Sequence, residues 1–267
     1  MMTLIAAMTL VLVTIPVVAI VVFASFLGVP IRHGSIYEKV QRFWGKALTL
    51  GGGVRVRLHG AEHIEQEAAC VYVANHVSWY DVFVLGGVLP RWSFVAKAEL
   101  RKIPIFGRGA EAVGTIFVER QNRRAAVKMY EKAAEQIQEG ASVVVYAEGT
   151  RGDSYALRPF KKGPFVLAIQ AGVPIIPVVI MGTREVMPRG QWLVNPGEVN
   201  LHFLEPILTA GMTFADRERL VAQAWTSMAN TLSSVYGIES DRRNVIGTEE
   251  VSSESNANST QASVMTQ

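Results

Sequence analysis

The first 31 residues carry no charged side chain, and this constrains the fold more than any other feature of the chain. About 20 apolar residues suffice to cross a bilayer as a helix, so Met1–Ile31 is long enough to span a membrane or to insert deeply. A cleaved signal peptide would have a basic N-terminal end and a shorter apolar core. Pro16 removes one helical hydrogen bond, which favours a bent or re-entrant helix as much as a straight one. We therefore expect an uncleaved membrane anchor.

Basic residues follow this apolar run directly. Residues 31–60 contain six basic side chains and one acidic side chain, whereas the formal net charge of the whole 267-residue chain is only +3. Such a flank predicts that the body of the protein lies at the cytoplasmic face, here of a cell inner membrane, where it also attracts anionic headgroups. The small net charge does not indicate a nucleic-acid partner. The basic residues are Arg32, Lys39, Arg42, Lys46, Arg55 and Arg57.

The segment Ser35–Leu50 has apolar residues at helical spacing and a basic opposite face. Beside an apolar anchor, a basic amphipathic helix is typical of a segment that lies on a membrane surface. The alternative is an ordinary helix that faces the protein core. We expect membrane contact, and we assign residues 1–50 to an N-terminal membrane-anchoring region.

Strand-like and helix-like patterns alternate after Gly51, which predicts an α/β body with a mixed, largely parallel sheet flanked by helices. We expect this catalytic domain to cover residues 51–240 and a disordered tail, rich in Ser, Thr, Asn and Gln, to cover 247–267. The expected strands are 54–60, 69–75, 92–96, 115–118, 142–147, 174–182 and 199–203, and the expected helices 78–89, 121–139, 165–171 and 213–236.

A polar pair, Asn75-His76, ends the strand-like run in VYVANHVSWYDVF, and Asp81 follows five residues after the histidine. One interpretation is a helix cap, because Ser78 and Asp81 fit the S-x-x-D form of a capping box. The other is acid–base chemistry, because a carboxylate can hold an imidazole in one tautomer and stabilise its cation. A capped helix start after a strand-end loop brings the two side chains together. The motif favours the second interpretation without excluding the first.

Four sequence blocks occur in the order found in the glycerolipid acyltransferases, the family of the 1-acylglycerol-3-phosphate acyltransferases. NHVSWYD resembles the NHxSxxD motif of that family, and GTIFVER (114–120), AEGTRG (147–152) and VPIIPV (173–178) resemble its other three. Glu119, Gly152 and Pro164 differ from the residues that are usual in the family. The resemblance covers roughly residues 51–203.

This resemblance implies transfer of a fatty acyl group from an acyl thioester to the free sn-2 hydroxyl of lysophosphatidic acid, giving phosphatidic acid. His76 would be the general base and Asp81 would orient it. Another lysolipid, such as a lyso-ornithine lipid or a lysophospholipid, is the alternative acceptor. The implied co-substrate is acyl-coenzyme A or an acylated acyl carrier protein, with no cofactor and no metal. The substrate-binding residues would be Arg120, Glu148, Gly149, Thr150 and Arg151.

Two other classes of protein compete with an acyltransferase. A metal-dependent hydrolase would need a third clustered ligand near His76 and Asp81. A non-catalytic lipid-binding module would explain the basic helix and the arginines but not the His76–Asp81 pair. The other histidines considered, which lack carboxylates at a suggestive spacing, are expected to be structural or solvated: His59, His63 and His202. Pro174 and Pro177 are expected to shape an edge strand.

Overall fold

The computed structural model describes residues 1–31, 34–64, 68–90, 92–118, 133–135, 137–138 and 140–245. Arg120, most of the helix expected over 121–139 and the tail expected over 247–267 lie outside the described residues. The division into an anchoring region, a catalytic domain and a tail therefore stays a prediction.

One sheet of seven strands forms the centre of the described structure. Each strand lies within two residues of a run that the sequence predicts. The strands are β1 (Val54–His59), β2 (Val71–Ala74), β3 (Trp92–Lys97), β4 (Ile116–Val118), β5 (Ser142–Tyr146), β6 (Ile175–Met181) and β7 (Gly197–Phe203).

The strand order is β1-β7-β6-β2-β5-β3-β4. From β6 to β4 all neighbours are parallel, whereas β7 is antiparallel to β6 and β1 is parallel to β7. A mixed, largely parallel sheet is what the alternation of strand and helix patterns predicts, and this prediction is confirmed.

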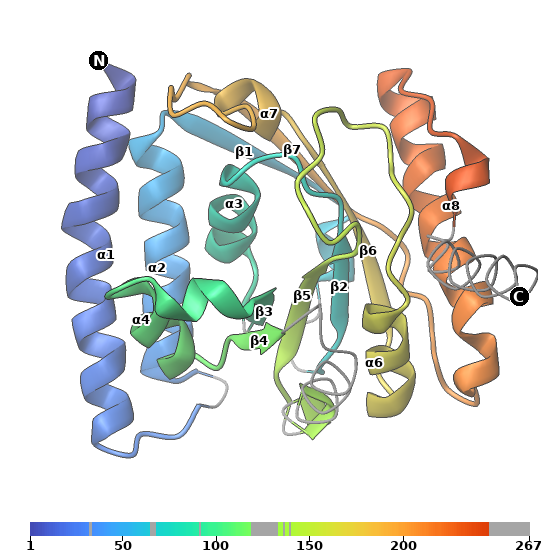
Figure 1. The fold of residues 1–267 in the computed structure, drawn as a ribbon, viewed down its shortest axis with the longest axis horizontal. Coiled ribbons are helices and arrows are strands. Elements are labelled where there is room, and N and C mark those ends of the chain that lie inside the picture. The colour runs from blue at the N-terminus through green and yellow to red at the C-terminus, as the bar shows by residue number, and fades with distance from the viewer. Residues whose placement is uncertain are drawn as a thin grey trace, which may run out of the picture.

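Helices cover both faces of the sheet (Figure 1). On one side lie α3 and α4, with α2 and then α1 outside them, and on the other side lie α6 and α8. The short helix α7 follows β6 at the upper edge in that view. The helices are α1 (Met2–Phe26), α2 (Ile36–Gly51), α3 (Tyr80–Val88), α4 (Phe106–Ala112), α6 (Gly163–Ala171), α7 (Thr183–Val186) and α8 (Arg217–Tyr236).

The central strands are buried on both faces, which explains their nearly continuous apolar sequences. In β2, Val71 and Val73 belong to the core under α6 and α8, while Tyr72 and Ala74 belong to the core under α3. β5 alternates in the same way. The period-2 geometry of a strand thus divides one apolar run between two cores.

The N-terminal helix α1 is docked along the body of the protein. Trp44 Nε1 of α2 donates to Thr14 Oγ1 of α1 (3.0 Å), and a Cβ at Gly109 of α4 would lie 2.6 Å from Val18 Cγ2. α1 continues through Pro16 as one helix. It is long and apolar enough to cross a membrane, and most of its side chains are not buried.

α2 faces the protein core on one side and exposes apolar side chains on another. Tyr37, Val40 and Leu48 are buried between α1 and the body, as in a core-facing helix, but Phe43 and Leu50 stay exposed. Its close approach to α3 depends on glycine, since a Cβ at Gly45 would lie 2.3 Å from a backbone nitrogen of α3. Contact between α2 and a membrane stays a prediction.

The expectation that Pro174 and Pro177 shape an edge strand is wrong, because β6 lies inside the sheet between β7 and β2. Pro177 is tolerated there because the β6–β7 register begins one residue later, at the pair Val178 and Phe203. Its missing N–H therefore falls beyond the paired residues of the ladder. Its carbonyl still accepts a hydrogen bond from Leu204 N (2.9 Å).

Candidate active site

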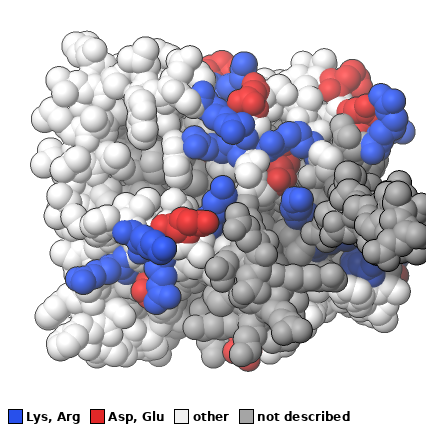
Figure 2. All heavy atoms as spheres, viewed as in Figure 1, with Lys and Arg blue, Asp and Glu red and all other residues white. Residues whose placement is uncertain are grey.

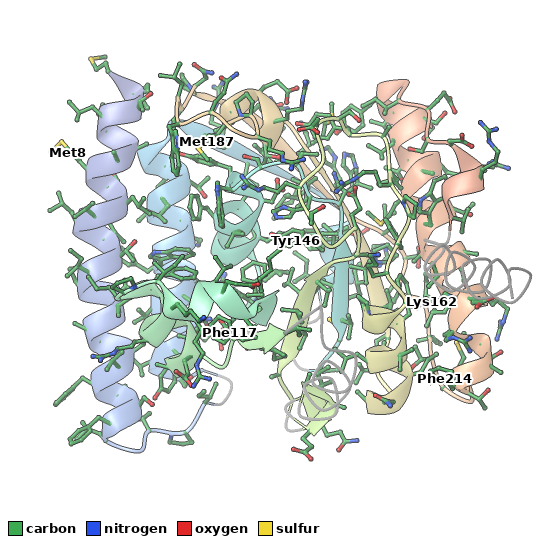
Figure 3. The ribbon with its side chains drawn as sticks, viewed as in Figure 1. Met8, Phe117, Tyr146, Lys162, Met187 and Phe214 are labelled. Atoms are coloured by element: carbon green, nitrogen blue, oxygen red, sulfur yellow. The ribbon has the colours of Figure 1, made fainter. Side chains whose placement is uncertain are left out.

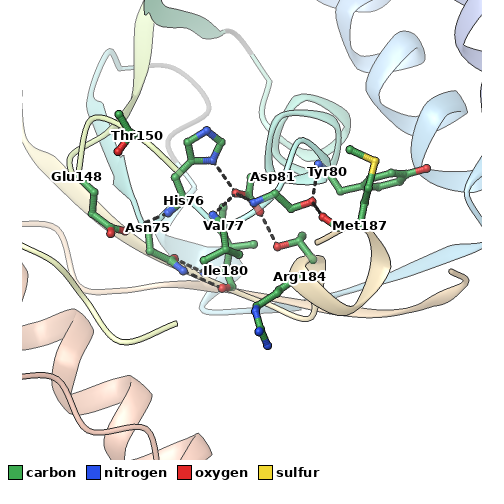
Figure 4. Close-up of polar contacts among 12 residues, drawn as sticks. Asn75, His76, Val77, Tyr80, Asp81, Glu148, Thr150, Ile180, Arg184 and Met187 are labelled. Carbon is green, nitrogen blue, oxygen red and sulfur yellow. Dashed lines mark hydrogen bonds and ion pairs between the residues drawn. The ribbon is translucent and has the colours of Figure 1, made fainter. Parts of the chain in front are cut away.

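The site lies at one edge of the sheet, where three neighbouring parallel strands end. His76 follows the end of β2 by two residues, Glu148 follows the end of β5 by two, and Thr183 follows the end of β6 by two. Since β2 lies between β5 and β6, these three positions meet at the carboxyl edge, where α/β sheets bind their ligands. The close-up in Figure 4 shows how their side chains lie.

His76 and Asp81 are in direct contact. His76 Nδ1 and Asp81 Oδ2 are 2.7 Å apart, and the Asp81 side chain is completely buried (Figure 4). Asp81 lies in the first turn of α3, so the helix start turns its carboxylate back towards the end of β2. With Nδ1–H donating to the carboxylate, Nε2 carries the lone pair that can accept a proton.

Asp81 also holds the turn that precedes α3, so its contacts are compatible with both interpretations of the sequence, and the catalytic one stays a prediction. Oδ2 accepts hydrogen bonds from Val77 N (2.8 Å) and Ser78 N (2.9 Å). Oδ1 accepts one from Thr183 Oγ1 (2.5 Å). A carboxylate with this many donors is held in one orientation, and with it the imidazole ring.

Ser78 differs in detail from the expected cap. Helix α3 begins at Tyr80 with Trp79 as its N-cap, so Ser78 lies one residue before the capping position. Its hydroxyl accepts from Tyr80 N (3.2 Å) and donates to Met187 O (2.8 Å). These two bonds direct the hydroxyl into the structure and away from a role as a nucleophile.

The His76 ring packs against Tyr146, the last residue of β5. The two rings are stacked with centroids 3.9 Å apart and planes 14° apart. The His76 side chain is 14% exposed, and within the described part of the chain no residue forms a hydrogen bond with Nε2. Burial, together with the negative charge of Asp81, raises the pKa of Tyr146, so its phenol stays neutral beneath the imidazole.

Asn75 fixes the end of β2 against β6. Its side chain donates to Ile180 O (3.0 Å) and accepts from Ile180 N (2.7 Å), as a backbone amide would in a ladder. It is fully buried. Of the polar pair Asn75-His76, Asn75 therefore has a structural role, whereas His76 lies at the candidate active site.

The EGTR turn wraps around the backbone of His76. Glu148 Oε1 accepts from His76 N (3.2 Å), and Gly152 N donates to His76 O (2.7 Å). Gly149 has a φ of 80°, a backbone conformation that favours glycine. The turn thus holds the histidine from the side opposite to α3.

Arg158 holds this turn in place, and no sequence pattern predicts this role. Its Nε is 2.7 Å from Glu148 Oε2, and its other nitrogens donate to the backbone and side-chain oxygens of Thr150. Burial raises the pKa of Glu148, while the hydrogen bond and charge of Arg158 oppose that rise. Contact of Glu148 with substrate hydroxyls stays a prediction, since both oxygens already have partners here.

The guanidinium of Arg151 packs on Trp79, which lies between His76 and Asp81 in the chain. It lies over the Trp79 ring, 4.6 Å from the centroid, and no carboxylate of the described residues lies within ion-pair distance of it. Desolvation and the neighbouring Arg189 lower its pKa, whereas Asp81 acts in the opposite direction. A partly buried guanidinium that has no carboxylate partner among the described residues is well suited to bind an anion such as a phosphate.

Thr183 and Arg158 are the two site residues that sequence reasoning missed. Thr183 lies two residues after the end of β6, the strand that contains most of the fourth sequence block, so the rule that carboxyl ends of parallel strands meet was a usable signal for it. Arg158 lies in a loop and carries no pattern of its own. In the described ranges no group of three or more His, Cys, Asp or Glu side chains is placed to hold a metal ion.

Comparisons with known proteins identify several similar sequences. A family model described as Acyltransferase matches residues 55–181. An uncharacterized acyltransferase of Schizosaccharomyces pombe is 34% identical over 81% of this chain and 78% of its own length. The human 1-acyl-sn-glycerol-3-phosphate acyltransferase beta is 35% identical over 67% of this chain and 65% of that protein. The chain spans about half the length (49%) of a chloroplast 1-acyl-sn-glycerol-3-phosphate acyltransferase of Brassica napus, at 34% identity over 63% of this chain.

A solved structure is also similar. The crystal structure of the 1-acyl-sn-glycerophosphate acyltransferase PlsC from Thermotoga maritima superposes with a TM-score of 0.72 at 27% sequence identity, covering 90% of this chain and 97% of that one. The agreement therefore extends well beyond the matched motifs. The chain belongs to the acyltransferase family that includes the 1-acyl-sn-glycerol-3-phosphate acyltransferases, and it is an acyltransferase.

Proposed function

We propose that the protein transfers a fatty acyl group from an acyl thioester to the sn-2 hydroxyl of lysophosphatidic acid, giving phosphatidic acid. The observation that carries this proposal is the fixed His76–Asp81 pair, in which Nε2 of His76 has no hydrogen-bond partner among the described residues and can accept a proton. The names of the relatives support lysophosphatidic acid as the acceptor.

His76 acts as general base in this proposal. Nε2 takes the proton of the acceptor hydroxyl as its oxygen attacks the thioester carbonyl, and Asp81 stabilises the imidazolium that forms. The tetrahedral intermediate then expels the thiolate, which receives the proton from His76. The products are the ester and the free thiol of coenzyme A or of an acyl carrier protein. No acyl-enzyme forms, so Ser78 is not needed as a nucleophile.

Arg151 binds the phosphate of the acceptor, and Arg120, predicted from the second sequence block, assists it. The Arg151 guanidinium packs on Trp79, between His76 and Asp81 in the chain, and interacts electrostatically with Asp81, which supports a phosphate site next to the His76–Asp81 pair. Arg151→Ala should raise the KM for the acceptor more than the KM for the donor. A loss of about 2–4 kcal/mol in kcat/KM is expected for a charge-assisted contact in a partly desolvated site.

The site works at a membrane in this proposal. Helix α1 and the exposed apolar residues of α2 contact the cytoplasmic face of the bilayer, where the acceptor resides. Wild-type protein should remain with membranes after a high-salt wash, because apolar burial is not screened by salt. Release by salt alone would contradict the anchor.

Product analysis with purified full-length protein tests the reaction. The acceptors offered are lysophosphatidic acid, lysophosphatidylcholine and a lyso-ornithine lipid, each with acyl-coenzyme A and with acylated acyl carrier protein. Phosphatidic acid should form fastest. Equal rates with acceptors that lack an exposed phosphate monoester would contradict the role of Arg151, and thioester hydrolysis without ester formation would contradict acyl transfer to a lipid.

A further inference from the structure

The segment between α7 and β7 is an exposed loop with a fixed base. Asn195 N donates to Val186 O (2.9 Å), which closes the loop, and Met187 and Val194 at its two ends are buried. We call residues 188–196 the 188–196 loop. Its tip is solvent-exposed, with Trp192 81% exposed and the adjacent Leu193 63% exposed. Two neighbouring large apolar side chains that a closed loop presents to solvent indicate a contact surface.

The base of the loop is bonded to the candidate active site. Met187 O accepts from Ser78 Oγ (2.8 Å), in the same turn that carries His76 and Asp81. Arg189 Nη1 donates to Arg151 O (3.1 Å) and pairs with Asp153 (3.3 Å). Whatever the tip contacts is therefore held at a set position relative to His76.

The apolar tip continues the exposed surface of the N-terminal end of α1. Val194 N donates to Thr3 Oγ1 (3.1 Å), so the loop and the first turn of the helix are joined. Figure 3 shows Met187, at the base of the loop, at the same end of the molecule as Met8 of α1, with Phe214 at the opposite lower corner. The exposed apolar residues at this end of α1 are Met1, Leu4, Ile5 and Met8.

Positive charge lies directly behind the tip. Figure 2 shows uncharged surface at the upper left, where α1 and α2 lie, and Lys and Arg side chains with some acidic ones among them at the upper centre, where that surface ends. Arg184 and Arg189 are exposed in this part of the chain, and Arg151 is bonded to the loop. An exposed tryptophan next to arginines matches the water–lipid interface, since indole favours the headgroup level and guanidinium binds phosphate.

We propose that the 188–196 loop is a second lipid-binding surface, distinct from α1, that binds an anionic bilayer. Trp192 and Leu193 insert into the interfacial layer, and Arg189 lies at the level of the lipid phosphates. The proposal rests on the proposed function in one respect: the acceptor is a lipid, and the loop holds His76 close to the bilayer from which that lipid comes.

Site-specific labelling tests insertion without any assay of activity. The only cysteine of the chain, Cys70, is fully buried, so Leu193→Cys can be labelled with an environment-sensitive fluorophore on the full-length protein. Leu208→Cys is the matched control, because Leu208 is equally exposed at 68% and lies outside the loop. The vesicles contain phosphatidylcholine and phosphatidylglycerol, with and without a quencher attached to the lipid.

Vesicles should shift the emission at position 193 to shorter wavelength, and the lipid-borne quencher should reduce it. The emission at position 208 should not respond. Emission at position 193 that stays polar in vesicle-bound protein would overturn the proposal. A shift produced by acyl carrier protein in the absence of vesicles would assign the loop to a protein partner and would overturn it equally.

Kinetics test the consequence for the site. The double variant Trp192→Ala, Leu193→Ala should raise the apparent KM about tenfold for an acceptor presented in vesicles, because two apolar contacts with the bilayer are lost. For a short-chain acceptor dissolved below its critical micelle concentration, the same variant should raise the apparent KM by less than about twofold. The double variant Leu208→Ala, Phe214→Ala removes a similar exposed pair elsewhere and should change neither value.

An equal increase in the apparent KM for both acceptors, or no increase for either, would overturn the lipid-binding role of the loop. The two proposals fail separately. Wild-type protein that transfers no acyl group in any assay would contradict the proposed function, while the fluorescence at position 193 would still decide whether the loop inserts.

Discussion

His76 and His202 are two largely buried histidines in one sheet that are held in opposite ways. His76 follows β2 and contacts the Asp81 carboxylate, 2.7 Å from Nδ1. His202 lies in β7 at the other side of the sheet, where its ring stacks on His59 with centroids 4.2 Å apart, and its Nε2 is 2.6 Å from the Tyr236 hydroxyl. Burial, with a smaller contribution from His59, lowers the pKa of His202 from 6.5 to about 4.

The difference shows that the partner, and not burial alone, decides what a histidine in this fold can do. A carboxylate offers a place for the positive charge that forms when the imidazole takes a proton. A second imidazole offers none, so His202 stays neutral and packs as a structural ring. This agrees with the expectation that His202 is structural.

The largest expected effect is the loss of activity in His76→Ala. Removal of a positioned general base should lower kcat by about 10²–10⁴-fold. His202→Gln is the matched control, because it removes an imidazole that lacks a carboxylate partner, and it should keep most of the activity at pH 7. Initial rates and melting curves on the same preparations decide. An active His76→Ala protein would contradict the mechanism, whatever the family membership.

The next largest effect concerns the Asp81 carboxylate, which distinguishes His76 from His202. Asp81→Asn preserves an oxygen for the Val77 and Ser78 N–H groups but removes the negative charge. Unfolding free energy should fall by only about 1 kcal/mol, while kcat should fall by about 10²-fold or more, because the imidazolium is no longer stabilised.

Ser78→Ala separates capping from catalysis in the same turn. It should cost about 1 kcal/mol of stability and keep most of the activity, since the Ser78 hydroxyl contacts only Tyr80 N and Met187 O. If Asp81→Asn behaved like Ser78→Ala, with small losses of stability and near-normal turnover, Asp81 would be a cap alone.

A smaller effect is expected from Arg158, which acts on His76 through Glu148. Arg158→Ala removes the hydrogen bond and the charge that oppose the burial-induced rise in the pKa of Glu148, so that pKa should rise further. Glu148 then protonates at a higher pH on acidification, and the acid limb of the kcat profile should move to higher pH. At pH 7, kcat should fall about tenfold.

Arg158→Lys keeps the charge but not the fork that reaches Glu148 and Thr150, and it should recover part of the loss. A role confined to stability would lower the melting temperature in Arg158→Ala and leave the pH profile of kcat in place.

The smallest effect concerns His202 and the stability of the β1–β7 side of the sheet. Its folded pKa of about 4 lies below the ordinary value of 6.5, so between these two values the unfolded chain binds more protons than the folded one. Stability should therefore fall as the pH is lowered from 6.5 towards 4, by about 1–3 kcal/mol from this residue. His202→Gln should flatten that part of the curve.

Equilibrium unfolding at several pH values measures this slope. His63→Gln is a suitable control, because His63 has only long contacts to Glu62 and Glu205, at 4.0 and 3.7 Å. An unchanged slope in His202→Gln would show that the acid sensitivity of the protein comes from other groups. The lowered pKa of His202 would then have no measurable effect on stability.

Much of this protein was determined by local sequence. The strand and helix periods predict each strand of the sheet to within two residues, because burial on two faces leaves a continuous apolar run whatever the neighbours are. The contact between His76 and Asp81 also follows from local geometry, since a strand end followed by a helix start within five residues can bring the two side chains together. Turn and cap chemistry acts over a few residues and can be read from them.

Only the tertiary structure decided the rest. Thr183 reaches Asp81 across 102 positions of the chain because β2 and β6 are neighbours in the sheet. Arg158 reaches Glu148 because the loop after β5 folds back on itself. The same strand order places Pro177 in an internal strand, where the sequence predicted an edge. Pairing between distant strands depends on how whole helices pack on the sheet. Those contacts involve residues far apart in the chain, so no local pattern encodes them.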